Sequence, residues 1–247
     1  GEQDDSTRAA REMVEAKVGC IVTIGGDGTN RVVAKGCGDT PVLPVSTGTN
    51  NVIPYMIEGT VAGVAAGIVA TRTVSRERAT IPTKRLSIIK DGKDTDIALV
   101  DAVVSVDLFV GARALWDISR VKEVVVARGE PDNIGISSIV GSFHPIGVRD
   151  QMGMWLALGE GGFSVRATIS PGLICEIPVK RYELIKVGDR VQIADEACTI
   201  ALDGEREISV RKGDRLSVEL RRDGPLLVDI KRTLAEAVKS GSFRAPH

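Results

Sequence analysis

The chemistry suggested by this chain begins at residues 25–29, where three glycines, one carboxylate and one hydroxyl follow a short β-branched segment, Ile21–Ile24. The five residues are Gly25, Gly26, Asp27, Gly28 and Thr29. Glycines leave backbone N–H groups open to a phosphate and permit positive φ. Asp27 could hold Mg²⁺ or accept a proton from an attacking hydroxyl, and Thr29 offers a further donor. The pattern predicts a phosphate-binding loop, and a tight strand-to-helix turn is the simpler alternative.

A predicted helix over Asn30–Lys35 follows the loop directly, so the positive end of its dipole would face a bound anion. Two common glycine motifs are excluded. A dinucleotide fingerprint starting at Gly26 needs a third glycine where Arg31 stands, and a P-loop needs Lys and Ser or Thr after its last glycine. We predict that Asn30 and Arg31 contact the nucleotide. For Arg31, an exposed helix position is an equal alternative.

A second polar loop, residues 46–51, follows the next apolar segment, Pro41–Val45. Because parallel strands end at the same edge of a sheet, we expect both loops to lie along one crevice. Asparagine amides can bond a ribose or an adenine edge, although in loops they commonly bond their own turn. The nucleotide contacts predicted in this loop are Thr47, Gly48, Thr49, Asn50 and Asn51.

The Gly-Gly-Asp-Gly-Thr loop resembles the signature shared by NAD kinases, diacylglycerol kinases and sphingosine-type lipid kinases. Ser46–Asn51 is similar to the Gly-Thr-x-Asn loop of the lipid kinases, and Leu202-Asp203-Gly204-Glu205 resembles the Asp-Gly-Glu motif of the second domain. The arrangement is most similar to the acetoin catabolism protein X group of NAD-kinase-like proteins. The resemblance implies a Rossmann-like α/β domain, then a β-sandwich, with the active site between them, and a homo-oligomer.

Taken alone, Asp203-Gly204 predicts a hairpin turn. The resemblance implies that Asp203 and Glu205 are catalytic with Asp27, and that Asp203 and Glu205 are candidate Mg²⁺ ligands. Carboxylates at a shared cleft suit phosphoryl transfer, in which Mg²⁺ and an oriented hydroxyl meet the phosphate. The sequence leaves open which carboxylate is the base and which holds the metal.

Three further positions have open interpretations. Asp107 is either a helix cap or part of a segment similar to one in lipid kinases. Gly135–Ser142 lies where NAD kinases carry an acceptor-binding loop, but it matches that loop poorly, which puts NAD as the acceptor in question. His144 is the sole histidine before the last residue, has no partner at metal-ligand spacing, and is predicted to be a loop residue.

The predicted helices and strands around these motifs divide the chain into three parts. Residues 1–79 form the α/β nucleotide-binding domain, residues 80–228 form the β-sandwich, and residues 229–247 form a helix that returns to the first domain. Because relatives begin with a strand and helix not seen here, we expect the first strand of the α/β domain to be missing. The β assignment rests on dense turn signals at Asp91-Gly92, Gly129-Glu130-Pro131, Gly159–Gly162, Gly188-Asp189, Asp203-Gly204, Gly213-Asp214 and Asp223-Gly224.

Bulk composition narrows the function. A formal charge of −1 over 247 residues and only two Trp, two Tyr and four Phe give no reason to expect nucleic acid. The apolar segment Val61–Ala70 is too short to span a membrane, and its small residues Gly63, Ala66 and Gly67 suit close packing on a sheet. Four widely spaced cysteines predict reduced core thiols in a cytoplasmic protein.

The predicted function is phosphoryl transfer from ATP or polyphosphate, with Mg²⁺, to a hydroxyl of NAD or another small metabolite. One alternative is a nucleotide- or NAD-binding accessory protein of acetoin catabolism that has lost catalysis. A lipid-type acceptor is a third possibility, because the second loop is similar to that of the lipid kinases. All three predicted functions place a nucleotide at residues 25–29.

Overall fold

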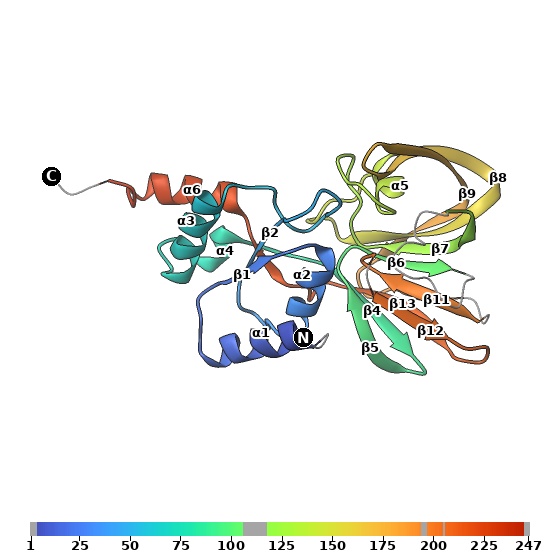
Figure 1. The fold of residues 1–247 in the computed structure, drawn as a ribbon, viewed down its shortest axis with the longest axis horizontal. Helices are drawn as coiled ribbons and strands as arrows, with labels where there is room; N and C mark the ends of the chain where they lie inside the picture. Colours follow the sequence, from blue (N-terminus) through green and yellow to red (C-terminus); the bar gives the residue numbers. More distant parts are fainter. Residues whose placement is uncertain (1–3, 106–117, 194–196, 205, 245–247) are drawn as a thin grey trace. The chain divides into compact units, whose positions relative to one another are not determined.

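The computed structural model describes residues 4–105, 118–193, 197–204 and 206–244. They form two compact units (Figure 1). Unit 1 comprises residues 1–48, 53–83 and 224–247, and unit 2 comprises residues 49–52 and 84–223. The predicted boundaries at 79/80 and 228/229 are therefore corrected, because two short strands next to these boundaries, Thr80–Pro82 and Leu226–Val228, pair with each other and complete the sheet of unit 1.

Unit 1 is an α/β layer built on a four-stranded sheet with the order β1-β2-β14-β3. Strands β1, β2 and β14 run parallel, and β3 is antiparallel to β14. The predicted order of helix, strand, loop, helix, strand and loop is confirmed. The elements are α1 Asp5–Glu15, β1 Ile21–Ile24, α2 Asp27–Ala34, β2 Val42–Val45, α3 Gly59–Ala70, α4 Arg76–Ala79, β3 Thr80–Pro82, β14 Leu226–Val228 and α6 Ile230–Lys239.

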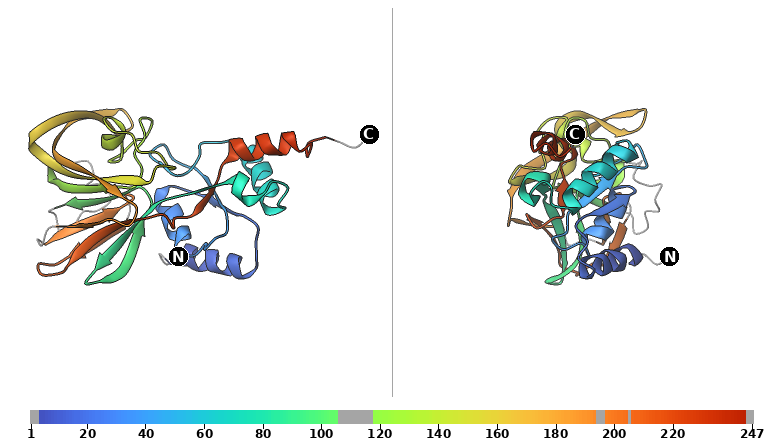
Figure 2. Two further views of the ribbon diagram at one scale, coloured as in Figure 1. Left: turned by 180° about the vertical axis from the view of Figure 1, so that it is seen from behind. Right: turned by 90° about the vertical axis from the view of Figure 1, so that its left-hand side faces the viewer.

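The C-terminal helix α6 returns to unit 1 as predicted and lies beside α3 and α4 in both views of Figure 2. Asp229 caps it by accepting a hydrogen bond from the Arg232 N–H, and Thr233 Oγ1 donates to the Ala79 carbonyl. The packing of α3 differs from the prediction. Ala62 and Ala65 are its small core residues, whereas Gly63 and Gly67 are exposed with open space around them.

Unit 2 is a β-sandwich, as predicted. One sheet has the strand order β10-β13-β4-β5, and the other has the order β12-β11-β6-β7-β8-β9. The helical segments of this unit are short. The elements are β4 Arg85–Lys90, β5 Lys93–Ala98, β6 Asp101–Ser105, η2 Ile118–Arg120, β7 Val121–Val126, α5 Ser138–Gly141, β8 Met152–Ser170, β9 Leu173–Lys186, β10 Arg190–Gln192, β11 Cys198–Leu202, β12 Arg206–Val210 and β13 Leu216–Arg221.

Two apolar cores hold unit 2 together. The first lies between the sheets, where side chains such as Ile88 and Val218 meet Val125 and Ile200. The second packs α5 against the long hairpin of β8 and β9. Side-chain direction alternates along a strand, so Val104 and Ile200 face the first core, whereas their neighbours Val103 and Ala201 face the second.

Two of the predicted glycine-containing turns are present, and one is not. Asp91-Gly92 forms a two-residue hairpin turn between β4 and β5, and Asp203-Gly204 lies in the connection between β11 and β12; all four residues take positive φ. Residues Gly159–Gly162 were predicted to separate two strands, and this is wrong. They lie inside β8, where the pairing with β9 skips from Leu158 to Phe163. Gly159 and Gly161 take positive φ there, so the glycines make a bulge instead of a turn.

Two cations hold the loop that precedes β8. The Lys84 Nζ donates to the carbonyls of Gly147 and Met152 at 3.1 and 2.6 Å. The Arg222 guanidinium donates to the carbonyls of Val148, Arg149 and Asp150. Both cations come from the ends of unit 2, so they fix the loop to the start and finish of the sandwich.

Lys84 is 3% exposed, and burial lowers the pKa of its ammonium group from 10.5 to about 8, opposed by the charge of Asp150. Between these pKa values the unfolded chain binds the extra proton, so the free energy of unfolding should rise with pH from about 8 to 10.5. Lys84→Met removes this dependence and leaves two carbonyls without their donor. We expect a loss of about 1–3 kcal/mol at pH 7 that grows at pH 10.

Urea denaturation of both proteins at pH 7, 9 and 10 measures this difference. A gap between wild type and Lys84→Met that stays constant across the three pH values would contradict the shifted pKa. Lys122→Met, which changes an exposed lysine of β7, is the matched control and should lose less than about 0.5 kcal/mol.

All four thiols are free. Cys37 and Cys198 are buried as predicted, whereas Cys20 and Cys175 are half-buried. Burial raises the pKa of Cys20 and of Cys37 to about 11, so both are unreactive thiols at neutral pH. None of the helices in the described ranges is both long and apolar enough to cross a membrane.

Candidate functional site

The glycine-rich loop joins β1 to α2, as the sequence predicts. The Gly25 N–H donates to the Val45 carbonyl at 3.0 Å, so the loop leaves the sheet beside the end of β2. Gly26 is the N-cap residue of α2, with φ −93° and ψ −168°, and Asp27 is the first helical residue. The N–H groups of the first turn of a helix make no bonds within the helix, and those of α2 belong to the residues predicted to hold phosphate.

One of the two reasons predicted for glycine in this loop, positive φ, is wrong. None of Gly25, Gly26 and Gly28 takes a positive φ. At Gly25 the reason is close packing, because an added Cβ would lie 2.5 Å from Thr29 Oγ1 and 2.8 Å from Thr29 Cβ. Thr29 thus lies directly against the Gly25 backbone, which gives the threonine a packing role in addition to its predicted role as a donor.

Asp27 is held in place by the segment that follows the second polar loop. Its side chain is 8% exposed, and Oδ1 accepts a hydrogen bond of 2.7 Å from the Ile53 N–H. A buried carboxylate fixed by a backbone amide at the first position of a helix has a set orientation beside the phosphate-binding N–H groups. Ile53 was not predicted as part of the site, because a backbone donor leaves no mark on the sequence.

Asn30 has a positioning role, and its predicted contact with nucleotide stays a prediction. It is 2% exposed, its Oδ1 accepts from Thr23 Oγ1 at 2.6 Å, and its Nδ2 donates to the Gly26 carbonyl at 2.8 Å. The side chain therefore ties the loop to β1. Arg31 is also 2% exposed, which excludes the alternative of an exposed helix position. A contact between Arg31 and phosphate stays a prediction.

Thr23 offers a direct test of this support. Thr23→Val keeps the shape of the side chain but leaves the buried Asn30 oxygen without its donor. We expect a loss of about 1–3 kcal/mol in the free energy of unfolding and weaker nucleotide binding. Urea denaturation and a nucleotide titration measure the two effects. Thr73→Val, at an exposed threonine of the same unit, is the control and should stay within about 0.5 kcal/mol of wild type. Equal stabilities would refute the positioning role.

The second polar loop is exposed from Thr47 to Asn50, and Asn51 is half-buried. Ser46 Oγ donates to the Gly48 carbonyl and accepts from the Gly48 N–H, which closes a local turn. Residues Thr49–Val52 belong to unit 2, where Asn50 Oδ1 lies 3.7 Å from the position of a Cβ built on Gly135. Asn50 thus lies beside the segment that the sequence compared with an acceptor-binding loop.

Asp203 stabilises the fold through hydrogen bonds to the backbone. Its carboxylate accepts hydrogen bonds from three successive N–H groups, those of Leu99, Val100 and Asp101, at 2.8–3.2 Å. It is 8% exposed and takes φ +49° in the β11–β12 turn. This carboxylate fixes the chain between β5 and β6. Asp203 therefore has a positioning role, and the catalytic and metal-binding roles that the resemblance implies stay predictions.

The next question is whether the residues near Asp203 could hold a divalent cation. Glu205 and Asp107 lie outside the described residues. Within the described ranges, no group of three or more His, Cys, Asp and Glu side chains is arranged to hold a metal. Because Glu205, one of the two predicted ligands, lies outside the described residues, the Mg²⁺ site stays a prediction. The N–H groups at the start of α2 suit a phosphate.

The Gly135–Ser142 segment is a compact turn leading into α5. Gly135 takes φ +97° and its N–H donates to the Thr168 carbonyl, while Ser138 Oγ donates to the carbonyls of Gly135 and Thr168. His144 lies in the bend after α5, so the prediction of a loop residue is confirmed. The hydroxyl of Ser138 is used to hold the turn, which gives the segment a fixed backbone.

Comparison with solved structures defines the class of fold. Yeast NADH kinase complexed with NADH has a TM-score of 0.51 and 13% identity, with 93% of this chain and 67% of that chain covered. A diacylglycerol kinase-like protein from Bacillus anthracis strain Sterne has a TM-score of 0.53 and 16% identity, with 92% and 84% covered. The α/β unit followed by a β-sandwich is therefore the NAD-kinase-like fold.

The sequence comparisons are more specific. Residues 1–73 match the ATP-NAD kinase N-terminal domain, and residues 84–223 match the acetoin catabolism protein X C-terminal domain. The acetoin catabolism protein X of Cupriavidus necator is 41% identical over 249 residues, covering 98% of this chain and 69% of that protein. The chain belongs to the acetoin catabolism protein X family, as its motifs predicted.

Proposed function

We propose that this protein is an NAD-kinase-like phosphotransferase that binds the phosphates of ATP or polyphosphate at residues 25–29 and phosphorylates a hydroxyl of NAD or another small metabolite. The observation that carries the proposal is the geometry of Asp27. A buried carboxylate at the first position of α2, fixed by the Ile53 N–H, stands beside the backbone donors that suit a phosphate.

In the reaction, the acceptor hydroxyl oxygen attacks the γ-phosphorus, and the bond from that phosphorus to the bridging oxygen breaks to release ADP. Asp27 takes the hydroxyl proton. The backbone N–H groups at the start of α2 stabilise the phosphate charge as it shifts. When bound, Mg²⁺ would neutralise further phosphate charge, held by the phosphates themselves and a carboxylate such as Asp27.

The two candidate bases differ in their surroundings. Asp203 accepts from three successive backbone N–H groups of unit 2, whereas Asp27 stands at the first position of α2, where a helix presents N–H groups to a phosphate. We therefore assign the base to Asp27, a choice that the sequence left open.

A second candidate is a nucleotide- or NAD-binding accessory protein without catalysis. One observation favours it: the Asp203 carboxylate is bonded to three backbone N–H groups of the fold. In that case the glycine-rich loop would still bind nucleotide. The protein would then act through what it binds within acetoin catabolism.

One experiment separates these candidates. The protein is titrated with ATP and with NAD by calorimetry in Mg²⁺ buffer, and the same preparation is incubated with γ-labelled ATP and NAD, glycerol-based lipid or small-metabolite hydroxyl acceptors. Label transferred to any acceptor at a rate above the protein-free control supports the kinase. Binding of ATP or NAD without transfer supports the accessory role, and binding of neither contradicts the nucleotide site on which both candidates depend.

The cellular setting is also a proposal. The four free thiols support a reducing compartment, in keeping with a cytoplasmic enzyme. The family resemblance favours a homo-oligomer, which sedimentation of the purified protein would measure directly.

A further inference from the structure

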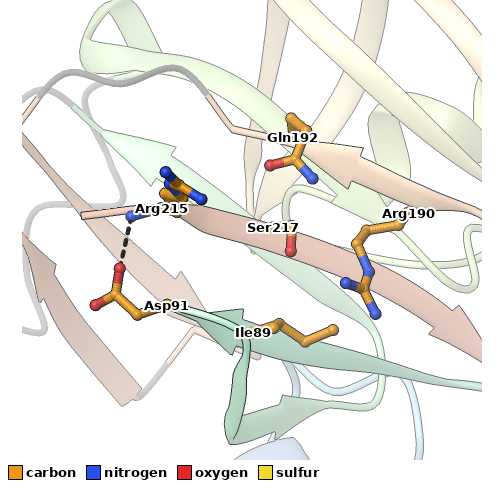
Figure 3. Close-up of a pocket in the computed structure, with 7 residues that line it drawn as sticks. Ile89, Asp91, Arg190, Gln192, Arg215 and Ser217 are labelled. Carbon is orange, nitrogen blue, oxygen red and sulfur yellow. Dashed lines mark hydrogen bonds between the residues drawn. The ribbon is translucent and has the colours of Figure 1, made fainter. Parts of the chain in front are cut away.

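A hollow of about 410 Å³ lies on the sheet of β10, β13, β4 and β5, away from the glycine-rich loop in sequence and belonging to unit 2 (Figure 3). It opens on the outer face of that sheet. Leu216 and Val218 point into the sandwich core, so Ser217 between them points outward, and Ile89 does so next to the core residue Ile88. The lining residues are Ile89, Asp91, Gly92, Arg190, Gln192, Arg215 and Ser217.

Strand register places these side chains in rows. Gln192 pairs with Ser217, and Ser217 pairs with Ile89, so these three form a central row across the strands. Arg190 on β10 lies two residues before Gln192, and Arg215 lies two residues before Ser217 on the antiparallel neighbour. Residues two apart share a face, so the two guanidinium groups approach the central row from opposite ends.

The charged groups at the two ends of the hollow make different bonds within unit 2. Arg190 donates to Glu219 at 2.7 Å, and Glu219 also accepts from Arg221, which together hold the pKa of Glu219 at about 2. Asp91 Oδ1 accepts from the Arg215 N–H at 3.0 Å, as the dashed line in Figure 3 shows. That bond involves the backbone of Arg215 and leaves its guanidinium available.

Several polar groups around the hollow make no bond within the part of the chain that the structure describes. Among the described residues, the Arg215 guanidinium, the Gln192 amide and the Ser217 hydroxyl have no hydrogen-bond or ion-pair partner. Ser217 is 5% exposed, so its hydroxyl lies deep in the hollow. The hollow thus offers donors from Arg190, Arg215, Gln192 and Ser217 and one acceptor, the second oxygen of Asp91.

We propose that this hollow is a second ligand site, which binds a small phosphate ester carrying a hydroxyl group. A tetrahedral phosphate presents several acceptor oxygens to the two guanidinium groups and to the Ser217 hydroxyl. The hydroxyl of the ligand donates to Asp91. Because the residues involved are separate from residues 25–29, the site does not depend on the proposed kinase function.

Calorimetry with the full chain tests the site with two probes that differ only in their hydroxyl groups, glycerol 1-phosphate and propyl phosphate. We expect wild type to prefer glycerol 1-phosphate. Arg215→Gln and Arg190→Gln should each weaken its binding about tenfold, because each removes a charge-assisted donor. Asp91→Asn keeps an oxygen for the Arg215 N–H and suits positive φ, yet it should abolish the preference for glycerol 1-phosphate.

Arg166→Gln, an exposed arginine of β8, makes the same charge change elsewhere and should leave binding unchanged. Thermal unfolding of every variant confirms that it is folded. Arg215→Gln changes an exposed side chain without a partner among the described residues, so this variant should fold. It therefore tests the ligand site even if Arg190→Gln fails to fold. Equal affinities in wild type, Arg215→Gln and Arg166→Gln would overturn the proposal, as would no measurable binding of either probe to wild type.

Discussion

Asp27→Asn is expected to lower the rate of phosphoryl transfer about 10³-fold, the range found when a general base is removed, while ATP binding and thermal stability stay close to those of wild type. The physical reason is that asparagine keeps an oxygen to accept the 2.7 Å bond from the Ile53 N–H but cannot take the proton of the acceptor hydroxyl. Steady-state transfer of γ-phosphate to the best acceptor, with calorimetric ATP binding, measures the separate effects.

The matched control is Asp39→Asn, which makes the same change at an exposed aspartate of unit 1 and should retain full activity. If Asp27→Asn transfers phosphate at the wild-type rate, Asp27 is not the base. If the variant is inactive because it has lost ATP binding or unfolds, the carboxylate serves binding or folding instead.

Asp203→Ala should produce the largest loss of stability. The substitution leaves three buried N–H groups without an acceptor and puts an alanine at φ +49°, so we expect the free energy of unfolding to fall by about 3–4 kcal/mol. Asp203→Asn keeps one acceptor oxygen and tolerates the positive φ, so it should lose roughly half as much. Urea denaturation of the three proteins gives the comparison.

The two roles considered for Asp203 predict different activities in Asp203→Asn. If Asp203 positions the chain between β5 and β6, the folded variant should retain transfer activity at temperatures below its transition. A folded but inactive Asp203→Asn would restore the catalytic or metal-binding role that the family resemblance implies. Asp132→Asn, at an exposed aspartate of unit 2, controls for the loss of a carboxylate.

Much of the fold could be predicted because its signals are local. A β-branched run, a glycine-rich turn and a helix start are consecutive at residues 21–34, and the hairpin turns of unit 2 have the Asp-Gly pairs that positive φ requires. The boundaries between the units were misplaced because β3 and β14 are three-residue strands. Their membership depends on pairing between segments more than a hundred residues apart.

The site was predicted less completely for the same reason. The position of Asp27 follows from its neighbours in the sequence, whereas its bond to Ile53 spans 26 residues and uses a backbone donor. The positioning role of Asn30 was not predicted, because its partner Thr23 stands on a strand that otherwise looks purely apolar. Asp203 accepts from N–H groups about a hundred residues away, a use that no local pattern reveals.

The central claim is that the backbone of residues 25–29 binds the phosphates of the donor. Titration of ¹⁵N-labelled protein with ATP tests it most directly, because each amide of the loop reports its own contact. The account predicts that the N–H resonances of Gly26 to Thr29 shift the most, with the same saturation point as calorimetry. Saturable ATP binding that leaves these resonances unmoved, while amides elsewhere shift, would contradict it.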